Sequence, residues 1–342
     1  MPTPARIRPA THRPMRGFTL VELLVVISII AILIALLVPV LAGVRIGARS
    51  ARTQTQMQSI LTACSQFKAQ NQRNPGVFSQ EDMGNADNAT RGFTNMENVL
   101  LDLAGGVVTD PGANAAAFLE VGPFASSGNV LVDLGRIGDS DGPGFLSLSD
   151  SDVAPGPPPG IANAQTQQVG AEANVAVPDI VDAFGYPILM WVKNDFAGSN
   201  SLFAAIESET GVVNPTRAQY YWNSNAGFLE SRSLGKRFDS DNFRKSALSS
   251  FNNSDDQRVR SLAGVLGDPA SPSPNATPPA PARARGEIVL HSAGVDGLYA
   301  ENDNGEIDQI VYLPTSGAGG GTFGENDQIA ERLNDILIGG GG

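Results

Sequence analysis

The stretch Phe18–Val44, FTLVELLVVISIIAILIALLVPVLAGV, decides how this chain is interpreted. From Leu23 to Val44 it holds 22 consecutive uncharged residues, most of them Leu, Ile, Val or Ala. An α-helix rises 1.5 Å per residue, so this segment is about 33 Å long and matches the ~30 Å hydrocarbon core of a bilayer. The sequence therefore predicts a transmembrane helix over residues 18–44.

A basic leader, residues 1–17, precedes this helix. It contains four arginines and no acidic residue: Arg6, Arg8, Arg13 and Arg16. The positive-inside rule places such a segment in the cytoplasm. A secretory signal peptide would have a shorter apolar core, followed by a small-x-small cleavage site. Here the apolar run leads straight into more helix, so we expect the helix to be retained.

One acidic residue, Glu22, interrupts the apolar pattern near its start. A carboxylate in this position costs a few kcal/mol unless it is paired or stays near the membrane surface. Two interpretations remain open: the side chain is solvated at the headgroups, or it meets a positive charge inside an assembly. Cleavage after Gly17 would leave Phe18 with a free α-amino group four residues from Glu22.

The sequence Gly17–Glu22, with the basic leader before it and Pro39 inside the apolar helix, resembles the N-terminal signature of type IV pilins and type II secretion pseudopilins. The resemblance implies that a prepilin peptidase cleaves between Gly17 and Phe18 and that Phe18 becomes N-methylated. It also implies that Glu22 pairs with the terminal amine of a neighbouring subunit during assembly. Pro39 removes one intrahelical hydrogen bond, which permits a kink; a proline merely tolerated in a membrane helix is the alternative.

The resemblance implies partners and a location as well. The chain would assemble with copies of itself into a helical filament, and it would meet the inner-membrane assembly platform and minor pseudopilins. Its N-terminus would be cytoplasmic, and its globular domain would lie in the periplasm beyond a single inner-membrane span.

The helix is expected to continue beyond the membrane as an amphipathic segment, residues 45–72. Its apolar residues recur at steps of three and four and therefore share one helix face: Met57, Ile60, Leu61, Cys64 and Phe67. Asn74-Pro75-Gly76 ends the pattern. A continuous helix from Phe18 to about Asn71 would be roughly 80 Å long, with Cys64 as a small core residue.

The remaining chain predicts a globular domain over 73–313, with insertions at 104–175 and 265–285. A short helix is expected at 96–103, and strands at 186–192, 218–229, 287–291 and 309–313. The tail, 314–342, is rich in glycine and carries a predicted amphipathic helix over Asp327–Ile338. The expected fold is α+β and pilin-like: a long N-terminal helix packed on a small antiparallel sheet.

A second resemblance lies in this domain. Asp182–Pro187 (DAFGYP) and Ser292–Gly297 (SAGVDG) are similar to the C-terminal half of the major pseudopilin of type II secretion, in which an acidic loop binds calcium. The corresponding loop here is Asp296–Asp308. The resemblance implies a calcium site with Asp296, Asp303, Asp308 and Asn304 as ligands. Glu301 and Glu306 are further candidate ligands. A solvated acidic hairpin loop is the alternative.

Composition argues against several classes of function. Beyond the leader, the chain has 19 basic and 35 acidic residues. A protein with this acidic net charge is unsuited to binding nucleic acid. One cysteine excludes an internal disulfide, and two histidines exclude a multi-histidine metal site. His291 and Ser292 are adjacent in a predicted strand, so they point to opposite faces and cannot act as base and nucleophile. We predict that the chain is not an enzyme.

The sequence thus predicts a type II secretion pseudopilin that polymerises through its N-terminal helix into a periplasmic pseudopilus driving protein export. One alternative is a type IV pilus subunit serving adhesion or motility. The other is a membrane-anchored calcium-binding envelope protein that never polymerises.

Overall fold

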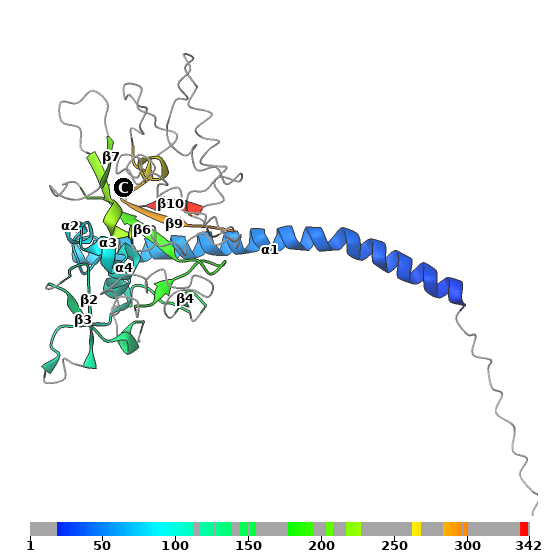
Figure 1. The fold of residues 1–342 in the computed structure, drawn as a ribbon, viewed down its shortest axis with the longest axis horizontal. Coiled ribbons are helices and arrows are strands. Elements are labelled where there is room, and N and C mark those ends of the chain that lie inside the picture. The colour runs from blue at the N-terminus through cyan, green and yellow to red at the C-terminus, as the bar shows by residue number, and fades with distance from the viewer. Residues whose placement is uncertain are drawn as a thin grey trace, which may run out of the picture. The chain divides into compact units, whose positions relative to one another are not determined.

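The computed structural model divides the chain into two compact units, Met1–Ala48 and Arg49–Gly342. The residues that it describes are 19–112, 117–125, 128–138, 144–149, 151–154, 177–194, 203–207, 217–226, 262–267, 283–295, 297, 299 and 336–340. The element order mixes helices with short antiparallel strands (Figure 1). This confirms the predicted α+β class.

Helix α1 spans Leu20–Asn71, 52 residues in all. The next residue, Gln72, adopts a left-handed φ of 57° and donates its backbone N–H to Lys68 O over 2.9 Å, which terminates the helix. The predicted apolar face is buried, with exposed fractions of 0–7% for Met57, Ile60, Leu61, Cys64 and Phe67. Burial raises the pKa of the Cys64 thiol to about 12, so this cysteine is an inert core residue.

Three shorter helices come directly after α1 in the described part of the chain: α2 (Gln80–Met83), α3 (Asn88–Arg91) and α4 (Asn95–Ala104). Helix α4 corresponds to the helix predicted at 96–103. It begins with a capping box, in which Thr94 Oγ1 accepts the backbone N–H of Glu97 and Glu97 Oε2 accepts the backbone N–H of Thr94. It ends at Gly105, whose φ of 89° favours glycine. Both helix ends are therefore encoded locally.

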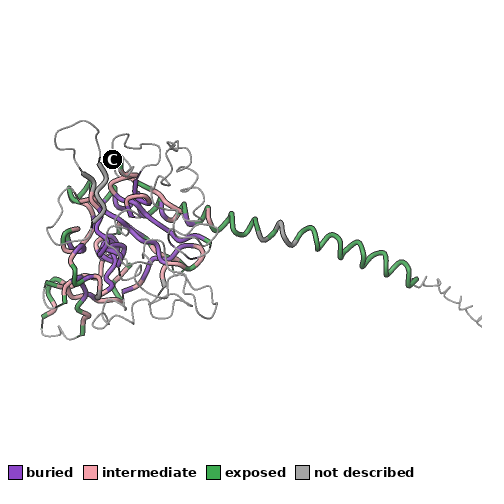
Figure 2. Tube along the Cα trace, turned by 45° about the horizontal axis from the view of Figure 1, so that its top comes forward, coloured by how far each residue is buried: buried purple, intermediate pink, exposed green. Residues whose placement is uncertain are grey.

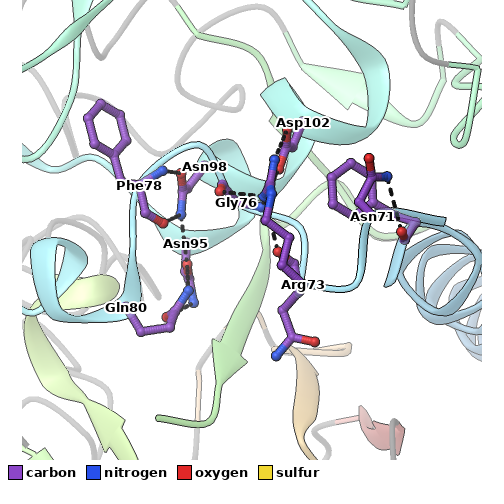
Figure 3. Close-up of polar contacts among 10 residues, drawn as sticks. Asn71, Arg73, Gly76, Phe78, Gln80, Asn95, Asn98 and Asp102 are labelled. Carbon is purple, nitrogen blue, oxygen red and sulfur yellow. Dashed lines mark hydrogen bonds and ion pairs between the residues drawn. The ribbon is translucent and has the colours of Figure 1, made fainter. Parts of the chain in front are cut away.

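Polar contacts join the end of α1 to α4 (Figure 3). Arg73 donates two hydrogen bonds to Asp102, of 2.5 and 3.1 Å, and its guanidinium lies 4.8 Å from the centre of the Phe67 ring. Asn98 accepts the backbone N–H of Phe78 (2.8 Å) and donates to its carbonyl oxygen (3.0 Å). These bonds fix the chain reversal between the two helices.

The strands among the described residues form four small antiparallel sheets. One has the order β1 (Val107–Val108), β3 (Val130–Val132), β2 (Leu119–Val121), and another has the order β10 (Ile336–Gly340), β9 (Ile288–Ser292), β6 (Ile188–Val192). Two pairs complete the set: β4 (Val153–Ala154) with β5 (Asp179–Ile180), and β7 (Phe203–Glu207) with β8 (Arg217–Tyr221). Short 3₁₀ turns lie at Leu134–Arg136 and Trp222–Ser224.

The sheet β10-β9-β6 is covered on both faces, and β6 and β9 lie together beside α1 and α4 in Figure 1. Ile188, Met190 and Val192 pack with the apolar face of α1 and with α4. Leu189 and Trp191 pack on the other face, with Tyr220, Trp222 and residues 262–266. This double burial explains why β6 reads ILMWV, without the polar alternation of a half-exposed strand. Figure 2 shows the resulting core in purple.

A separate apolar cluster lies under the sheet β1-β3-β2. It joins Val121 and Val132 to Phe78, Phe93 and Leu101, all at most 6% exposed. Part of the predicted insertion at 104–175 is therefore ordered around its own core.

Two predicted elements need correction. The strand expected at 218–229 ends at Tyr221 and gives way to the turn Trp222–Ser224; residues 227–229 lie outside the described part. The helix expected over Asp327–Ile338 is wrong at its end, since Ile336, Leu337 and Ile338 form strand β10. Their backbones pair with β9 in the core sheet, and that long-range pairing overrides the helical spacing. The predicted strand 309–313 is outside the described residues.

Candidate functional site

The first candidate site is the apolar part of α1. Leu20–Leu37 is apolar and long enough to cross a membrane, by length and composition. Every residue of this segment is exposed, shown in green in Figure 2. The exposed leucine, isoleucine and valine side chains of this segment demand an apolar surrounding, either lipid or other helices.

Glu22 caps the helix that carries it. Its Oε2 accepts the backbone N–H and the hydroxyl of Thr19, each over 2.8 Å, and Thr19 Oγ1 accepts the backbone N–H of Glu22 over 3.2 Å. This is a capping box, with Thr19 at the N-cap and Glu22 at the third helical position. The sequence interpretation missed the role of Thr19, although the Thr-x-x-Glu spacing signals it.

The other predicted assembly and processing residues fall in different places. Gly17 and Phe18 lie outside the described residues, and so does the leader. The backbone of Pro39 is helical within α1. Near it along the chain, a Cβ added at Gly43 or Gly47 would meet no atom within 4 Å beyond the local helix backbone, so either glycine leaves a bare patch on the helix surface.

The second candidate site brings together the two motifs predicted to flank a calcium loop. Ser292 donates its hydroxyl to Asp182 Oδ2 over 2.6 Å, while Asp182 Oδ1 accepts the backbone N–H groups of Phe184 and Tyr186. Burial raises the pKa of Asp182, and these hydrogen bonds oppose that rise in part. Asp182 therefore links the turn at residues 182–186 to the end of β9.

Further contacts tie the start of the acidic loop to the same turn. Gly297 has a φ of 75°, and a Cβ there would lie 2.3 Å from the Tyr186 ring, so the close approach requires glycine. The Tyr299 hydroxyl donates to the carbonyl oxygen of Pro187. The structure thus brings together DAFGYP and SAGVDG, whose bonded residues Asp182 and Ser292 lie 110 positions apart in the sequence.

The predicted calcium ligands lie outside the described residues: Asp296, Asp303, Asp308 and Asn304, together with the further candidates Glu301 and Glu306. Among the residues that are described, no three His, Cys, Asp or Glu side chains gather in a way that would hold a metal ion.

His291 and Ser292 have different surroundings. The His291 ring packs edge-on against Tyr299, with 5.2 Å between ring centroids, while the Ser292 hydroxyl is bonded to Asp182. The two side chains do not form a nucleophile–base pair.

Comparison with known proteins identifies the N-terminal part. The family described as "Prokaryotic N-terminal methylation motif" matches residues 12–38. This match supports a subunit of the type IV pilin-like or pseudopilin kind, anchored by its apolar helix, and implies prepilin peptidase processing and filament assembly in general. Such subunits are generally structural. No curated protein and no solved structure matches the chain.

Proposed function

We propose that this chain is a pseudopilin of a type II secretion system, which polymerises through its N-terminal helix into a periplasmic pseudopilus that drives protein export. The methylation motif at residues 12–38, leading into an exposed apolar helix, carries the proposal. The N-terminus would start in the cytoplasm, the helix would span the inner membrane, and the unit Arg49–Gly342 would be periplasmic. Assembly platform proteins and minor pseudopilins would be its partners.

The proposed assembly step uses the oxygen of Glu22 that the capping box leaves available. Cleavage before Phe18 creates an ammonium group, and Glu22 Oε1 accepts none of the bonds from Thr19. Among closely packed apolar helices, water is scarce, so an ammonium from the adjacent subunit is strongly favoured beside this carboxylate. Removing either charge leaves the other without a partner in apolar surroundings, which is strongly unfavourable.

A pair of variants tests this step, because glutamine keeps a capping box but has no charge. Glu22→Gln should abolish filament formation while the globular unit stays folded. Thr19→Ser keeps the cap and should assemble as the unmodified chain does. Glu81→Gln makes the same substitution at an exposed acid of the globular unit and serves as the matched charge control. Electron microscopy of envelope preparations measures assembly; normal filaments from Glu22→Gln would refute the charge pairing.

The type IV pilus subunit is the nearest alternative. Deletion of the gene should block protein export if the chain is a pseudopilin, whereas loss of surface filaments and motility with normal export would favour the pilus. The anchored envelope protein, the second alternative, predicts that Glu22→Gln has no effect on location or activity. Mass spectrometry of the extracted protein checks the first step: a chain that still begins at Met1 would refute processing.

The calcium site belongs to the same proposal. The resemblance to the major pseudopilin supports Asp296, Asp303, Asp308 and Asn304 as ligands, since Ca²⁺ takes six to eight oxygen ligands from such loops. The anchored start of the loop, through Gly297 and Tyr299, is compatible with a fixed site. Chelation of calcium should lower the melting temperature; an unchanged value in chelator would remove calcium from the proposal.

A further inference from the structure

The turn at residues 182–186 packs against α1 at the first residues of the globular unit. Thr53 Oγ1 accepts the backbone N–H of Ala183 over 3.1 Å, and the Arg49 guanidinium lies 6.0 Å from the centre of the Phe184 ring. Both α1 residues belong to the unit Arg49–Gly342, as the turn does. The turn therefore stays beside the residue at which this unit begins.

Arg49 lies close in the chain to the end of the membrane-spanning segment. The uncharged run ends at Val44, and the backbone of α1 continues as a helix through Arg49. Five residues of helix rise about 7.5 Å, and five residues in any conformation reach no further than about 18 Å. The headgroup layer on each side of a bilayer is about 5–8 Å thick. When the apolar segment is in a bilayer, Arg49 is therefore at the membrane surface, and the turn beside it is close to the lipid.

Arg49 is also the cation of this region that lacks a carboxylate partner. In the part of α1 that belongs to the globular unit, Arg52 is paired with Asp152 and Lys68 with Glu287. No described carboxylate lies within ion-pair distance of Arg49, whose side chain is exposed. Side chains on a helix lean toward its N-terminus, which for Arg49 is the direction of the apolar segment. Its guanidinium is thus available to a phosphate at the membrane surface.

Apolar side chains accompany this charge. Phe184 is only half-buried on its short turn. The hydrogen bond from Ser292 to Asp182 joins the SAGVDG motif to the same turn, and Val295 of that motif is 41% exposed. Among the described residues of the unit Arg49–Gly342, Val295 is the one large apolar side chain that is exposed. A guanidinium beside aromatic and aliphatic side chains matches the boundary between lipid headgroups and acyl chains.

We propose that Arg49, Phe184 and Val295 form a surface that binds phospholipid while α1 is in the membrane. The Arg49 guanidinium pairs with a lipid phosphate, and the two apolar side chains lie at the boundary between headgroups and acyl chains. This inference rests on the membrane span in the proposed function and does not require the filament. It gives the globular unit a resting position on the bilayer, which is lost when α1 leaves the lipid.

Quenching of tryptophan fluorescence by brominated lipid tests the proposal. The full chain is placed in nanodiscs of phosphatidylethanolamine and phosphatidylglycerol, in which part of the lipid is brominated close to the headgroup. Phe184→Trp and Val295→Trp should each lose fluorescence in the brominated discs. The native Trp191 and Trp222 are buried in the core and set a constant background.

Phe145→Trp is the matched control. Phe145 is half-buried, as Phe184 is, but its ring packs 5.2 Å from that of Phe67, which lies about 27 Å further along α1 than Arg49. Its tryptophan should not be quenched. Quenching of Phe184→Trp or Val295→Trp that is no stronger than that of the control would overturn the proposal. A chain that separates from the nanodiscs during gel filtration would overturn the membrane span, and with it the proposed function.

Substitution of Arg49 tests the contact with phosphate. In the Phe184→Trp chain, Arg49→Gln should weaken the quenching, whereas Arg49→Lys, which keeps the positive charge, should preserve it. Near-ultraviolet circular dichroism checks that both variants fold. Unchanged quenching in Arg49→Gln would overturn the pairing of Arg49 with lipid phosphate.

Discussion

Replacing Asn98 by alanine should cost more stability than any single exposed contact in the molecule. The Asn98 side chain is fully buried, and it bonds both the N–H (2.8 Å) and the carbonyl oxygen (3.0 Å) of Phe78. Phe78 is itself only 6% exposed. A buried polar group without a partner costs about 1–3 kcal/mol, so Asn98→Ala should lower the free energy of unfolding by about 2–6 kcal/mol.

Asn129 provides a matched control. It makes the same pair of bonds to the backbone of Phe124, of 3.2 and 3.0 Å, but on a half-exposed turn. Water can replace those bonds, so Asn129→Ala should lower the free energy of unfolding by no more than about 1.5 kcal/mol.

Urea unfolding of the full chain in detergent measures both variants. The signal is tryptophan fluorescence, since Trp191 and Trp222 are both buried in the core. If the two variants lose equal stability, or if Asn98→Ala loses less than about 1 kcal/mol, the buried bridge to Phe78 does not hold the α1–α4 connection as argued.

Three further outcomes follow from single positions. Gln72→Gly should raise the free energy of unfolding by about 1 kcal/mol, because Gln72 has a left-handed φ of 57°; an unchanged urea midpoint would contradict this. Gly339→Ala should lower it by about 1–3 kcal/mol, because the new Cβ would lie 2.4 Å from Arg285 O; no change in melting temperature would count against the placement of β10. Burial raises the pKa of Glu287, but hydrogen bonds from Lys68 and Asn74 outweigh it and hold this pKa below the ordinary value of a glutamate. The stability contributed by this carboxylate is complete above the pKa of an unfolded glutamate and is lost as the pH falls through the lowered pKa. Glu287→Gln should remove this part of the acid sensitivity in melting curves.

Local sequence patterns were sufficient to predict the elements whose ends and buried faces are set by nearby residues. The apolar face of α1 follows from its spacing, and α4 follows from the Thr94-x-x-Glu97 capping box and Gly105. Strand β6 was recognisable because burial on both faces gives a continuous apolar run, and β9 begins with the apolar residues Ile288, Val289 and Leu290. In each of these cases, the residue types and their spacing indicate which side chains are buried and where the element ends.

Strand β10 could not be predicted in this way, because ILIGG is a short apolar run and such runs suit a helix end or a strand equally well. Its state is decided by β9, more than 40 residues earlier, and by Gly339 and Gly340, which admit the neighbouring backbone and Leu61. The hydrogen bond from Ser292 to Asp182 also joins segments that are far apart in the sequence. The DAFGYP and SAGVDG motifs can each be found in the sequence, but only the fold shows that a hydrogen bond links them.

Thr19 changes the physical account of Glu22. An unpaired carboxylate at the start of an apolar helix would be strongly disfavoured before any partner arrives, yet the helix must exist before assembly. The capping box reduces this cost, since the N–H and hydroxyl of Thr19 bond Oε2 within the same chain. Oε1 is then available to an ammonium group from a neighbour, and binding it breaks no existing bond. In the proposed filament, helix capping and subunit pairing would therefore not compete for the same oxygen, so that one acidic residue would stabilise the single chain first and the assembly afterwards.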